Sequence, residues 1–346
     1  MKQIAAFSLF AVLLAFVLPL LLYLPGRGGA AAAEETENAA ETTPEAPPSP
    51  APAPEAGTAQ PVPDAARTLA VLTDKGVEEM TMADYLPAAL AGEMPASFSP
   101  EALKAQAVAL RTYALYYQAQ RKASHPEADV CAFSGCCAAL ASPETLRESW
   151  GAHYAEYTEK LSQAVRATDG QYLVWEEAPA LAVFHASSAA RTENAAALGM
   201  HQAYLVSVET PETVEDVRNL LSTVEVSPTE FAAAVRSVAP EAALSGAPET
   251  WLGAVHLDAS GRVESAEIGG RSLSGLALRQ LFSLRSTDFT LSFSEGRFVF
   301  RVRGYGHGLG MSQYGAELMA RSGADYAEIL AHYYPGTALV AAAQAP

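Results

Sequence analysis

The clearest periodic pattern in the chain is helical and follows the pair Ser99-Pro100. Five apolar residues recur there at the spacing of one helix face: Leu103, Ala107, Leu110, Ala114 and Tyr117. Serine is favoured as an N-cap and proline at the first helical position, so the pair marks where the helix begins. The pattern predicts a helix over about residues 100–121.

Shorter patterns predict the other elements. Residues 84–92 are expected to form a short helix or turn, and helices should follow Ser142-Pro143 and the capping box at 227–230. Two short helices are expected near the C-terminus, at about 312–321 and 326–334. Strands are expected at 171–175, 181–186, 252–257 and 263–268, with a hairpin that joins 289–293 to 298–302. Helices and strands are largely segregated along the chain, so the predicted fold class is α+β.

The first 26 residues are apolar enough to cross a bilayer. Residues 3–26 carry no charge and are mostly Leu, Ala, Val and Phe, and roughly 20 apolar residues span the hydrocarbon core. We expect a transmembrane anchor, with Lys2 on the cytoplasmic side and the rest of the chain outside the cytoplasm. The small-residue run at 30–33 keeps a cleaved signal peptide open as the alternative.

Composition divides the rest of the chain. Residues 27–69 are rich in Pro, Ala and Glu and bury too little apolar surface to fold, which predicts a disordered linker. Residues 70–340 are expected to fold as one elaborated domain or two closely joined lobes, and 341–346 form a tail. The formal net charge of −17 argues against a nucleic-acid partner, because phosphate binding needs a surface of Lys and Arg.

Three cysteines and a histidine form a short cluster after the predicted long helix. Its members are His125, Cys131, Cys136 and Cys137. Thiolates and imidazole are the ligands that zinc prefers, and four of them close a tetrahedral structural site. The spacing matches none of the common zinc fingers. A Cys131–Cys136 disulfide, or small buried residues without a ligand, therefore remain alternatives on the residues alone.

Three further features carry candidate chemistry. Glu93 lies among apolar neighbours with no adjacent base, so its carboxyl is either a desolvated acid or an ordinary loop glutamate. The glycine-rich stretch at 304–316 is either a ligand-binding loop or a tight structural turn. It supplies polar groups and an aromatic face at His307, Ser312, Gln313 and Tyr314. Arg111, on the predicted long helix, either binds an anionic ligand or forms an ion pair at the edge of the core.

The motifs resemble those of the stage II sporulation protein D family. Gly92-Glu93-Met94-Pro95 and the run at 100–114 look like sequences of that family, and so does the C-terminal run at 304–316. Shorter matches occur at 284–289 and 332–337, so the resemblance covers roughly residues 78–338. One motif departs from the family pattern. Ala189-Ala190 stands where the family has a glycine pair, which puts the turn and any substrate role of Ser187 in doubt.

The resemblance implies a lytic transglycosylase. Such an enzyme cuts peptidoglycan strands denuded of their peptides, between N-acetylmuramic acid and N-acetylglucosamine, and leaves 1,6-anhydromuramyl ends. Glu93 would be the acid and base, and His125, Cys131, Cys136 and Cys137 would hold a structural zinc. The glycan groove would be lined by Arg111, which could pair with a lactyl carboxylate, and by the four residues at 307 and 312–314.

The resemblance also implies a cellular setting. This is septal wall remodelling during engulfment in a spore-former, with the catalytic domain in the space between the membranes. The implied partners are the amidase called stage II sporulation protein P and a membrane partner. Two rival functions remain open from the sequence, a non-catalytic glycan-binding scaffold that recruits the amidase and a zinc or Cys/His hydrolase that uses the cluster at 125–137. His185 and Ser187 also invite a serine-hydrolase interpretation, but no nucleophile elbow surrounds the serine.

Overall fold

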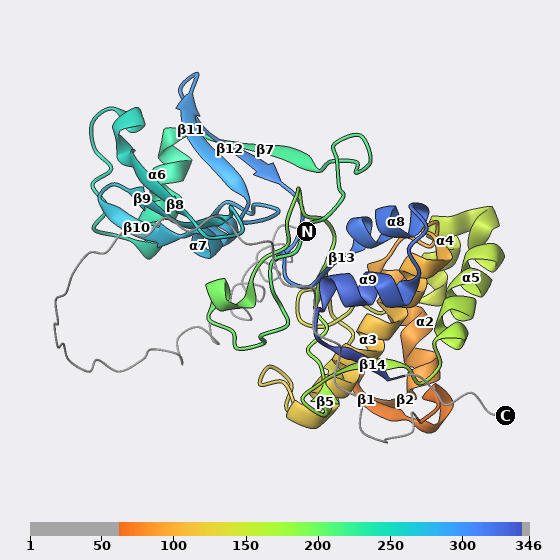
Figure 1. Cartoon of the computed structure of the whole chain (residues 1–346). Coiled ribbons are helices and arrows are strands. Elements are labelled where there is room, and N and C mark those ends of the chain that lie inside the picture. The colour runs from red at the N-terminus through yellow and green to blue at the C-terminus, as the bar shows by residue number, and fades with distance from the viewer. Residues whose placement is uncertain (1–61, 341–346) are drawn as a thin grey trace, which may run out of the picture. The chain divides into compact units, whose positions relative to one another are not determined.

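The computed structural model describes residues 62–340. The predicted anchor at 1–26, most of the predicted linker and the tail at 341–346 lie outside the described residues. Between residues 62 and 340, no helix is both long and apolar enough to cross a membrane. The described part is α+β, with helices and several small sheets (Figure 1).

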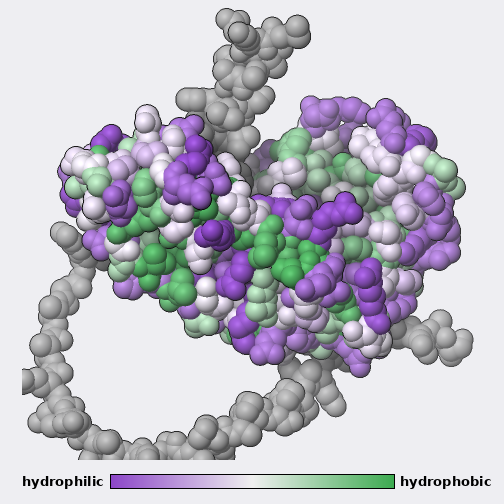
Figure 2. Space-filling view, turned by 90° about the horizontal axis from the view of Figure 1, so that it is seen from above, coloured by the Kyte–Doolittle hydropathy of each residue, from purple (hydrophilic) through white to green (hydrophobic). Residues whose placement is uncertain are grey.

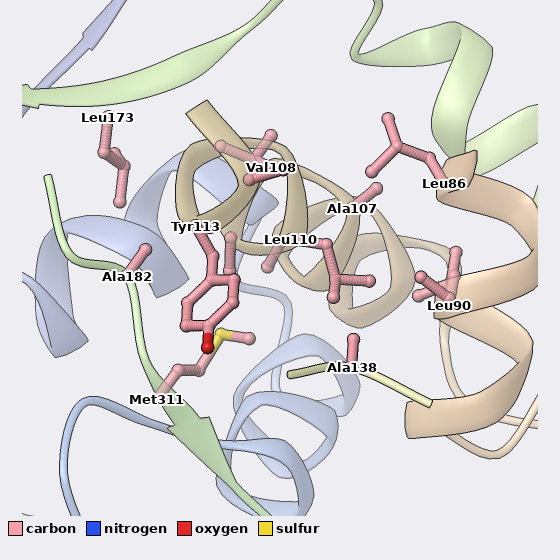
Figure 3. Packing of buried hydrophobic residues seen from close by; sticks show 14 of the residues in the cluster. Leu86, Leu90, Ala107, Val108, Leu110, Tyr113, Ala138, Leu173, Ala182 and Met311 are labelled. Atoms are coloured by element: carbon pink, nitrogen blue, oxygen red, sulfur yellow. The ribbon is translucent and has the colours of Figure 1, made fainter. Parts of the chain in front are cut away.

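The first of two hydrophobic cores is built around the predicted long helix, α3 (Pro100–Gln120). Four helices contact α3: α2 (Met82–Glu93), α5 (Tyr154–Ala167), α8 (Gln313–Arg321) and α9 (Tyr326–Tyr333). Figure 3 shows Leu86 and Leu90 of α2 pointing toward Ala107 and Leu110 of α3. Because neighbours cover α3 on several sides, nearly every residue from 102 to 115 is buried.

Small sheets and short helices complete the part of the chain that packs on this core. The strands β1 (Thr68–Thr73), β2 (Gly76–Thr81) and β3 (Val130–Cys131) form one sheet, in the order β2-β1-β3. A second sheet has the order β14-β4-β5 and is made of Ala338–Val340, Tyr172–Trp175 and Ala178–Pro179. The pair β6 (Phe184–His185) and β13 (Met311–Ser312) runs parallel. The helix α4 (Pro143–Trp150) precedes α5.

The second core gathers aromatic side chains between two three-stranded sheets and two helices. One sheet holds β7 (Leu221–Val226), β11 (Phe289–Ser294) and β12 (Arg297–Arg303), and the other holds β8 (Leu252–Leu257), β9 (Val263–Ile268) and β10 (Arg271–Ser274). Phe231 of α6 (Pro228–Val238) stacks on Phe298 with ring centroids 3.8 Å apart. The remaining helix is α7 (Gly275–Leu281).

Most predicted elements are confirmed. The strands β8 and β9 have the predicted bounds, and the β11–β12 hairpin turns at Glu295-Gly296, where both residues have positive φ. That is the backbone that tight hairpin turns require. The prediction of a strand over 181–186 is wrong for most of its length, because only Phe184 and His185 form β6.

The predicted linker ends too late. A 3-10 turn at Asp64–Ala66 and the strand β1 already belong to the folded part, and the Asp64 side chain is buried. The last residues assigned to the linker therefore belong to the folded domain. Composition did not predict this, because Asp64 is buried through a contact with Arg111, which is distant in the sequence.

Hydrophobic residues also lie on the surface. Figure 2 shows patches of them among hydrophilic residues on the face in view. Large exposed side chains include Leu221, Val255 and Leu257, all on strands of the sheets around the second core. Single exposed apolar side chains are normal on folded proteins and by themselves carry no functional meaning.

Candidate active site

Glu93 is the last residue of α2 and its carboxyl is half-buried. The helix ends there because Met94 takes an extended conformation and Pro95 follows. Oε1 of Glu93 accepts a hydrogen bond of 2.9 Å from the backbone N–H of Ala139. A side chain at Gly92 would overlap the carbonyl oxygen of Ala139. Glycine at position 92 therefore permits the close approach that brings this N–H to the carboxyl.

The surroundings of Glu93 favour its neutral form. Burial raises the pKa of Glu93 above its ordinary value, and the hydrogen bond from Ala139 opposes that rise only in part. Tyr85, on the same helix, is fully buried, and its hydroxyl has no hydrogen-bond partner among residues 62–340. Its pKa is raised by burial first and then by the charges of Cys137 and Glu93. Neither Tyr85 nor Ala139 is predictable as a neighbour of Glu93 from the sequence.

The His/Cys cluster is brought together as the spacing suggested. The ligand atoms of His125, Cys131, Cys136 and Cys137 all lie within 4.8 Å of one another, and the three cysteines are free. Nε2 of His125 is 3.3 Å from Sγ of Cys137, while its Nδ1 faces the carbonyl of Ala128 at 3.3 Å. A second contact of this kind orients a histidine for metal binding. One nitrogen and three sulfurs fit a tetrahedral zinc.

Electrostatics in the cluster favour a thiolate at Cys136, whereas the pKa values of Cys131 and Cys137 are raised. Hydrogen bonds from the thiols of Cys131 and Cys137 lower the pKa of Cys136. Lys122 donates to the carbonyl of Cys136, and its Nζ is 3.9 Å from Sγ of Cys137. A metal ligand must be deprotonated, so this positive charge helps the cluster to present sulfur as an anion.

The segment that carries the three cysteines also contacts Glu93. After β3, the chain returns to α2, where the N–H of Ala141 donates to the carbonyl of Ala88 at 3.1 Å. Ala139, which binds the Glu93 carboxyl, lies two residues after Cys137. Figure 3 shows the neighbouring Ala138 facing the same apolar cluster as Leu90. Whatever fixes the cysteines therefore also fixes the N–H that contacts Glu93.

Arg111 does not line a groove. Its side chain is fully buried and forms a two-pronged ion pair with Asp64, with Nε–Oδ1 and Nη2–Oδ2 distances both 2.7 Å. Nη1 also donates to the carbonyl of Gln171 at 2.9 Å. The prediction of a substrate contact is therefore wrong, and the alternative of a structural ion pair is correct.

The glycine-rich stretch has the predicted backbone. The glycines at 304, 306, 308 and 310 all have positive φ. At Gly308 a side chain would also strike Arg262, whose Cζ lies 2.7 Å from the position of a Cβ. The stretch thus packs backbone directly against the guanidinium, which only glycine allows.

The candidate sugar contacts of this stretch divide into two pairs. Ser312 and Gln313 are buried, Ser312 as the N-cap of α8 and Gln313 with its amide nitrogen 3.5 Å from Gln106 Oε1. Both are structural, so their prediction as direct sugar contacts is corrected. His307 is exposed, and Tyr314 is half-buried with its ring 5.1 Å from that of Phe98. For these two, the sugar-binding role stays a prediction.

A buried polar network lies behind the glycine-rich stretch. Nε2 of His185 is 2.6 Å from Oγ of Ser188, and Arg262 donates to the same oxygen at 2.9 Å. Ser188 is fully buried, and its N–H donates to Glu212. Burial raises the pKa of Glu212 to about 7, although hydroxyl and backbone donors oppose the rise. The partner of His185 is thus Ser188 rather than Ser187, and it lies out of reach of a substrate.

The motif that departs from the family pattern keeps a glycine-like turn. Ala190 has φ of 129°, a value that L-residues rarely adopt. Its carbonyl accepts a hydrogen bond from Thr210 N at 2.8 Å. The turn is therefore maintained by its surroundings despite the alanine pair.

Sequence comparisons relate this chain to sporulation proteins. A family model described as "Stage II sporulation protein" matches residues 72–175, which include Glu93 and the His/Cys cluster. The chain is 33% identical over 267 residues to the stage II sporulation protein D of Bacillus amyloliquefaciens, covering 76% of this chain and 75% of that protein. It is 32% identical to the protein of the same name from Bacillus subtilis (strain 168), over 76% of each. A 55-residue stretch, 16% of this chain and 8% of the relative, is 47% identical to the amidase enhancer of Bacillus subtilis (strain 168).

Proposed function

Because the chain belongs to the stage II sporulation protein D family, we propose that it is a lytic transglycosylase that remodels the septal wall during engulfment. Its substrate is the peptidoglycan glycan strand denuded of stem peptides, cut between N-acetylmuramic acid and N-acetylglucosamine. The observation that carries the proposal is the half-buried carboxyl of Glu93, with a raised pKa and a backbone N–H in contact.

One carboxyl is enough for this reaction. Neutral Glu93 donates its proton to the glycosidic oxygen as the bond to the anomeric carbon of the muramic acid breaks. The resulting carboxylate takes the proton of the 6-hydroxyl on the same sugar, while O6 bonds to the anomeric carbon. No water is consumed, and the carboxylic acid is restored. The N–H of Ala139 stabilises the carboxylate between the two transfers.

The partners of the neighbouring acids support a mechanism with a single carboxyl. A hydrolase would need a second carboxyl across the scissile bond. Asp84 accepts from the Thr81 hydroxyl at 2.6 Å in the first turn of α2. Glu101 pairs with Lys104 at 2.6 Å and accepts from the N–H of Tyr326 at 3.1 Å. Both carboxylates are therefore engaged in structural contacts, and Glu101 also lies in the first turn of α3, where a negative charge is favourable.

Product analysis tests the function. Denuded glycan incubated with the full chain should yield fragments that end in 1,6-anhydromuramic acid and therefore lack one water relative to hydrolytic products. Mass spectrometry distinguishes the two kinds of end directly. Reducing ends would instead identify a hydrolase, and intact strands that remain bound would identify the glycan-binding scaffold.

The residues at 125, 131, 136 and 137 are proposed to hold a structural zinc. With four protein ligands the metal leaves no open coordination position, so its contribution is to hold the loop that follows α3. Their tight cluster and the oriented His125 support this role. The rival use of the cluster as a hydrolytic centre would require an open position for water.

Metal removal should lower stability before it affects chemistry. Purified protein is expected to contain one zinc per chain, and a chelator should lower the midpoint of thermal unfolding, because the cross-link between residues 125 and 137 is lost. Cys131→Ser should give a lower metal content and a lower midpoint together. Loss of turnover at an unchanged unfolding midpoint would contradict the structural role and favour the hydrolytic one.

The proposed cellular setting rests on the family assignment and on the apolar N-terminal sequence. An anchor at residues 1–26 would place the catalytic domain on the outer side of the cell membrane, in the intermembrane space during engulfment. The amidase called stage II sporulation protein P is the proposed partner, since it would supply denuded strands, together with a membrane partner. The short similarity to an amidase enhancer supports a link to peptidoglycan breakdown.

A further inference from the structure

An exposed tyrosine in the glycine-rich stretch lies close to two arginines, Arg279 and Arg285. The Tyr305 side chain is 48% exposed, and the guanidinium of Arg285 lies 4.3 Å from its ring centroid. Backbone hydrogen bonds hold the group together. Leu284 N–H donates to the carbonyl of Arg279 at 2.9 Å, and Gly306 N–H donates to the carbonyl of Arg285 at 2.9 Å. The result is an aromatic surface with a cation stacked against it.

Neither arginine is neutralised within residues 62–340. Nε of Arg279 donates to the carbonyl of Leu284 at 3.3 Å, and Nη1 of Arg285 donates to the carbonyl of Asn219 at 3.0 Å. No carboxylate of the described residues forms an ion pair with either, whereas Arg303 on the same core pairs with Asp288 at 2.8 Å. Two cations without counter-ions in a chain of net charge −17 form a local site that attracts anions.

A buried arginine, Arg262, pairs with Glu193 and acts on Arg279. Arg262 is 2% exposed, and its Nε and Nη1 have no hydrogen-bond partner among the described residues. Its nearest carboxylate oxygen, on Glu193, is 3.8 Å from Nε. Burial lowers the pKa of Arg279 first, and the charge of Arg262 lowers it further. The guanidinium groups of Arg262 and Arg279 therefore repel one another, and an anion bound at Arg279 would relieve that repulsion.

Backbone hydrogen bonds and an aromatic contact connect this site to the loop that follows Glu93. Tyr305 exchanges two backbone hydrogen bonds with Ser187, at 2.8 and 3.1 Å. The adjacent Ala186 accepts from Tyr314 N at 3.1 Å, and the Tyr314 ring packs on Phe98. A glycan strand repeats its muramic acid in every disaccharide. A strand cut at Glu93 therefore offers further acidic sugars to a site some distance away.

We propose that Arg279 and Arg285 bind the lactyl carboxylate of a muramic acid whose ring lies against Tyr305. This inference rests on the proposed function and adds a basis for its substrate selection. The carboxylate is free only after the stem peptide has been removed, because the peptide is attached there through an amide. The site thus distinguishes denuded from peptide-bearing strands by charge. The two arginines thus take the role that the family resemblance implied for Arg111.

Binding measurements in a Glu93→Gln background test this without cleavage. The full chain is mixed with denuded strands, and separately with the same strands after coupling of their carboxylates to methylamine. The parent should bind the carboxylate strands about tenfold more tightly at low salt, as charge-assisted hydrogen bonds to one carboxylate allow. Adding Arg279→Gln and Arg285→Gln should remove that preference and leave binding of the amidated strands unchanged.

A matched control separates a site from general charge. Arg301 is exposed on β12 in the same core and forms no ion pair within residues 62–340, so Arg301→Gln should keep the preference. Equal affinity of the parent for both strands, or an equal loss in the Arg301 variant, would overturn the proposal. If the double variant does not fold, the two single variants and the charge-preserving Arg285→Lys replace it in the same binding comparison. The two proposals can fail separately. If the wild-type protein forms no anhydro ends but the Glu93→Gln parent still prefers carboxylate strands, the lytic activity is refuted and the binding site is not.

Discussion

Glu93→Gln is expected to abolish the formation of 1,6-anhydromuramyl ends. Glutamine has the size of glutamate and can still accept the hydrogen bond from Ala139, but it can neither donate nor accept the transferred proton. Loss of a general acid–base group costs about 10²- to 10⁴-fold in rate, and here one residue performs both transfers. The initial rate on denuded glycan, followed by mass spectrometry of the ends, measures the effect.

The matched control is Glu79→Gln. Glu79 is exposed on β2, so the substitution changes the same charge and atoms away from the site. It should retain wild-type activity. A Glu93→Gln protein that still releases anhydro ends at a comparable rate would refute the mechanism, because no other group has been assigned the proton.

The pH dependence of the rate follows from the same carboxyl. The first transfer needs the protonated form, which is lost as pH rises through the pKa of Glu93. Burial raises that pKa, so the falling limb of the pH–rate profile should lie at higher pH than for an exposed glutamate. A limb at the ordinary pKa of glutamate would indicate that the carboxyl is solvated during catalysis.

Much of the fold was predictable because its signals are local. The hairpin at β11–β12 and the helix α3 follow from periodicity and turn residues. The helix α2 was underestimated, as residues 84–92 suggested only a short helix or turn. Pro87 interrupts its hydrogen bonding, but burial of Leu86 and Leu90 on the first core compensates. That compensation is tertiary and leaves no local signature.

The site was predictable to the extent that its parts lie close in sequence. The His/Cys cluster spans thirteen positions and closes on itself, so spacing alone suggested it. The N–H of Ala139 and the hydroxyl of Tyr85 were missed because nothing in a backbone amide or a helical tyrosine identifies a neighbour of Glu93. Ser312 was misassigned because a helix N-cap and a sugar contact use the same residue type.

Arg111→Leu is expected to lower the free energy of unfolding by about 3–5 kcal/mol, because it leaves the carboxylate of Asp64 buried without its partner. Both oxygens of that carboxylate are committed to the guanidinium at 2.7 Å, and both side chains are nearly inaccessible to water. Urea unfolding measures the loss. The surface pair Arg271–Glu241 supplies the control, since Arg271→Leu should cost no more than about 1 kcal/mol.

A double variant that also replaces Asp64 distinguishes the cost of an unpaired buried charge from the cost of lost packing. If the charge dominates, Asp64→Leu combined with Arg111→Leu should be more stable than Arg111→Leu alone, because no ion remains buried without a partner. Strictly additive losses would contradict this account. The outcome also bears on where the folded chain begins, because Asp64 precedes β1 within the stretch whose composition suggests a linker. A large loss of unfolding free energy in Arg111→Leu would show that residues 64–66 stabilise the domain as well as pack against it.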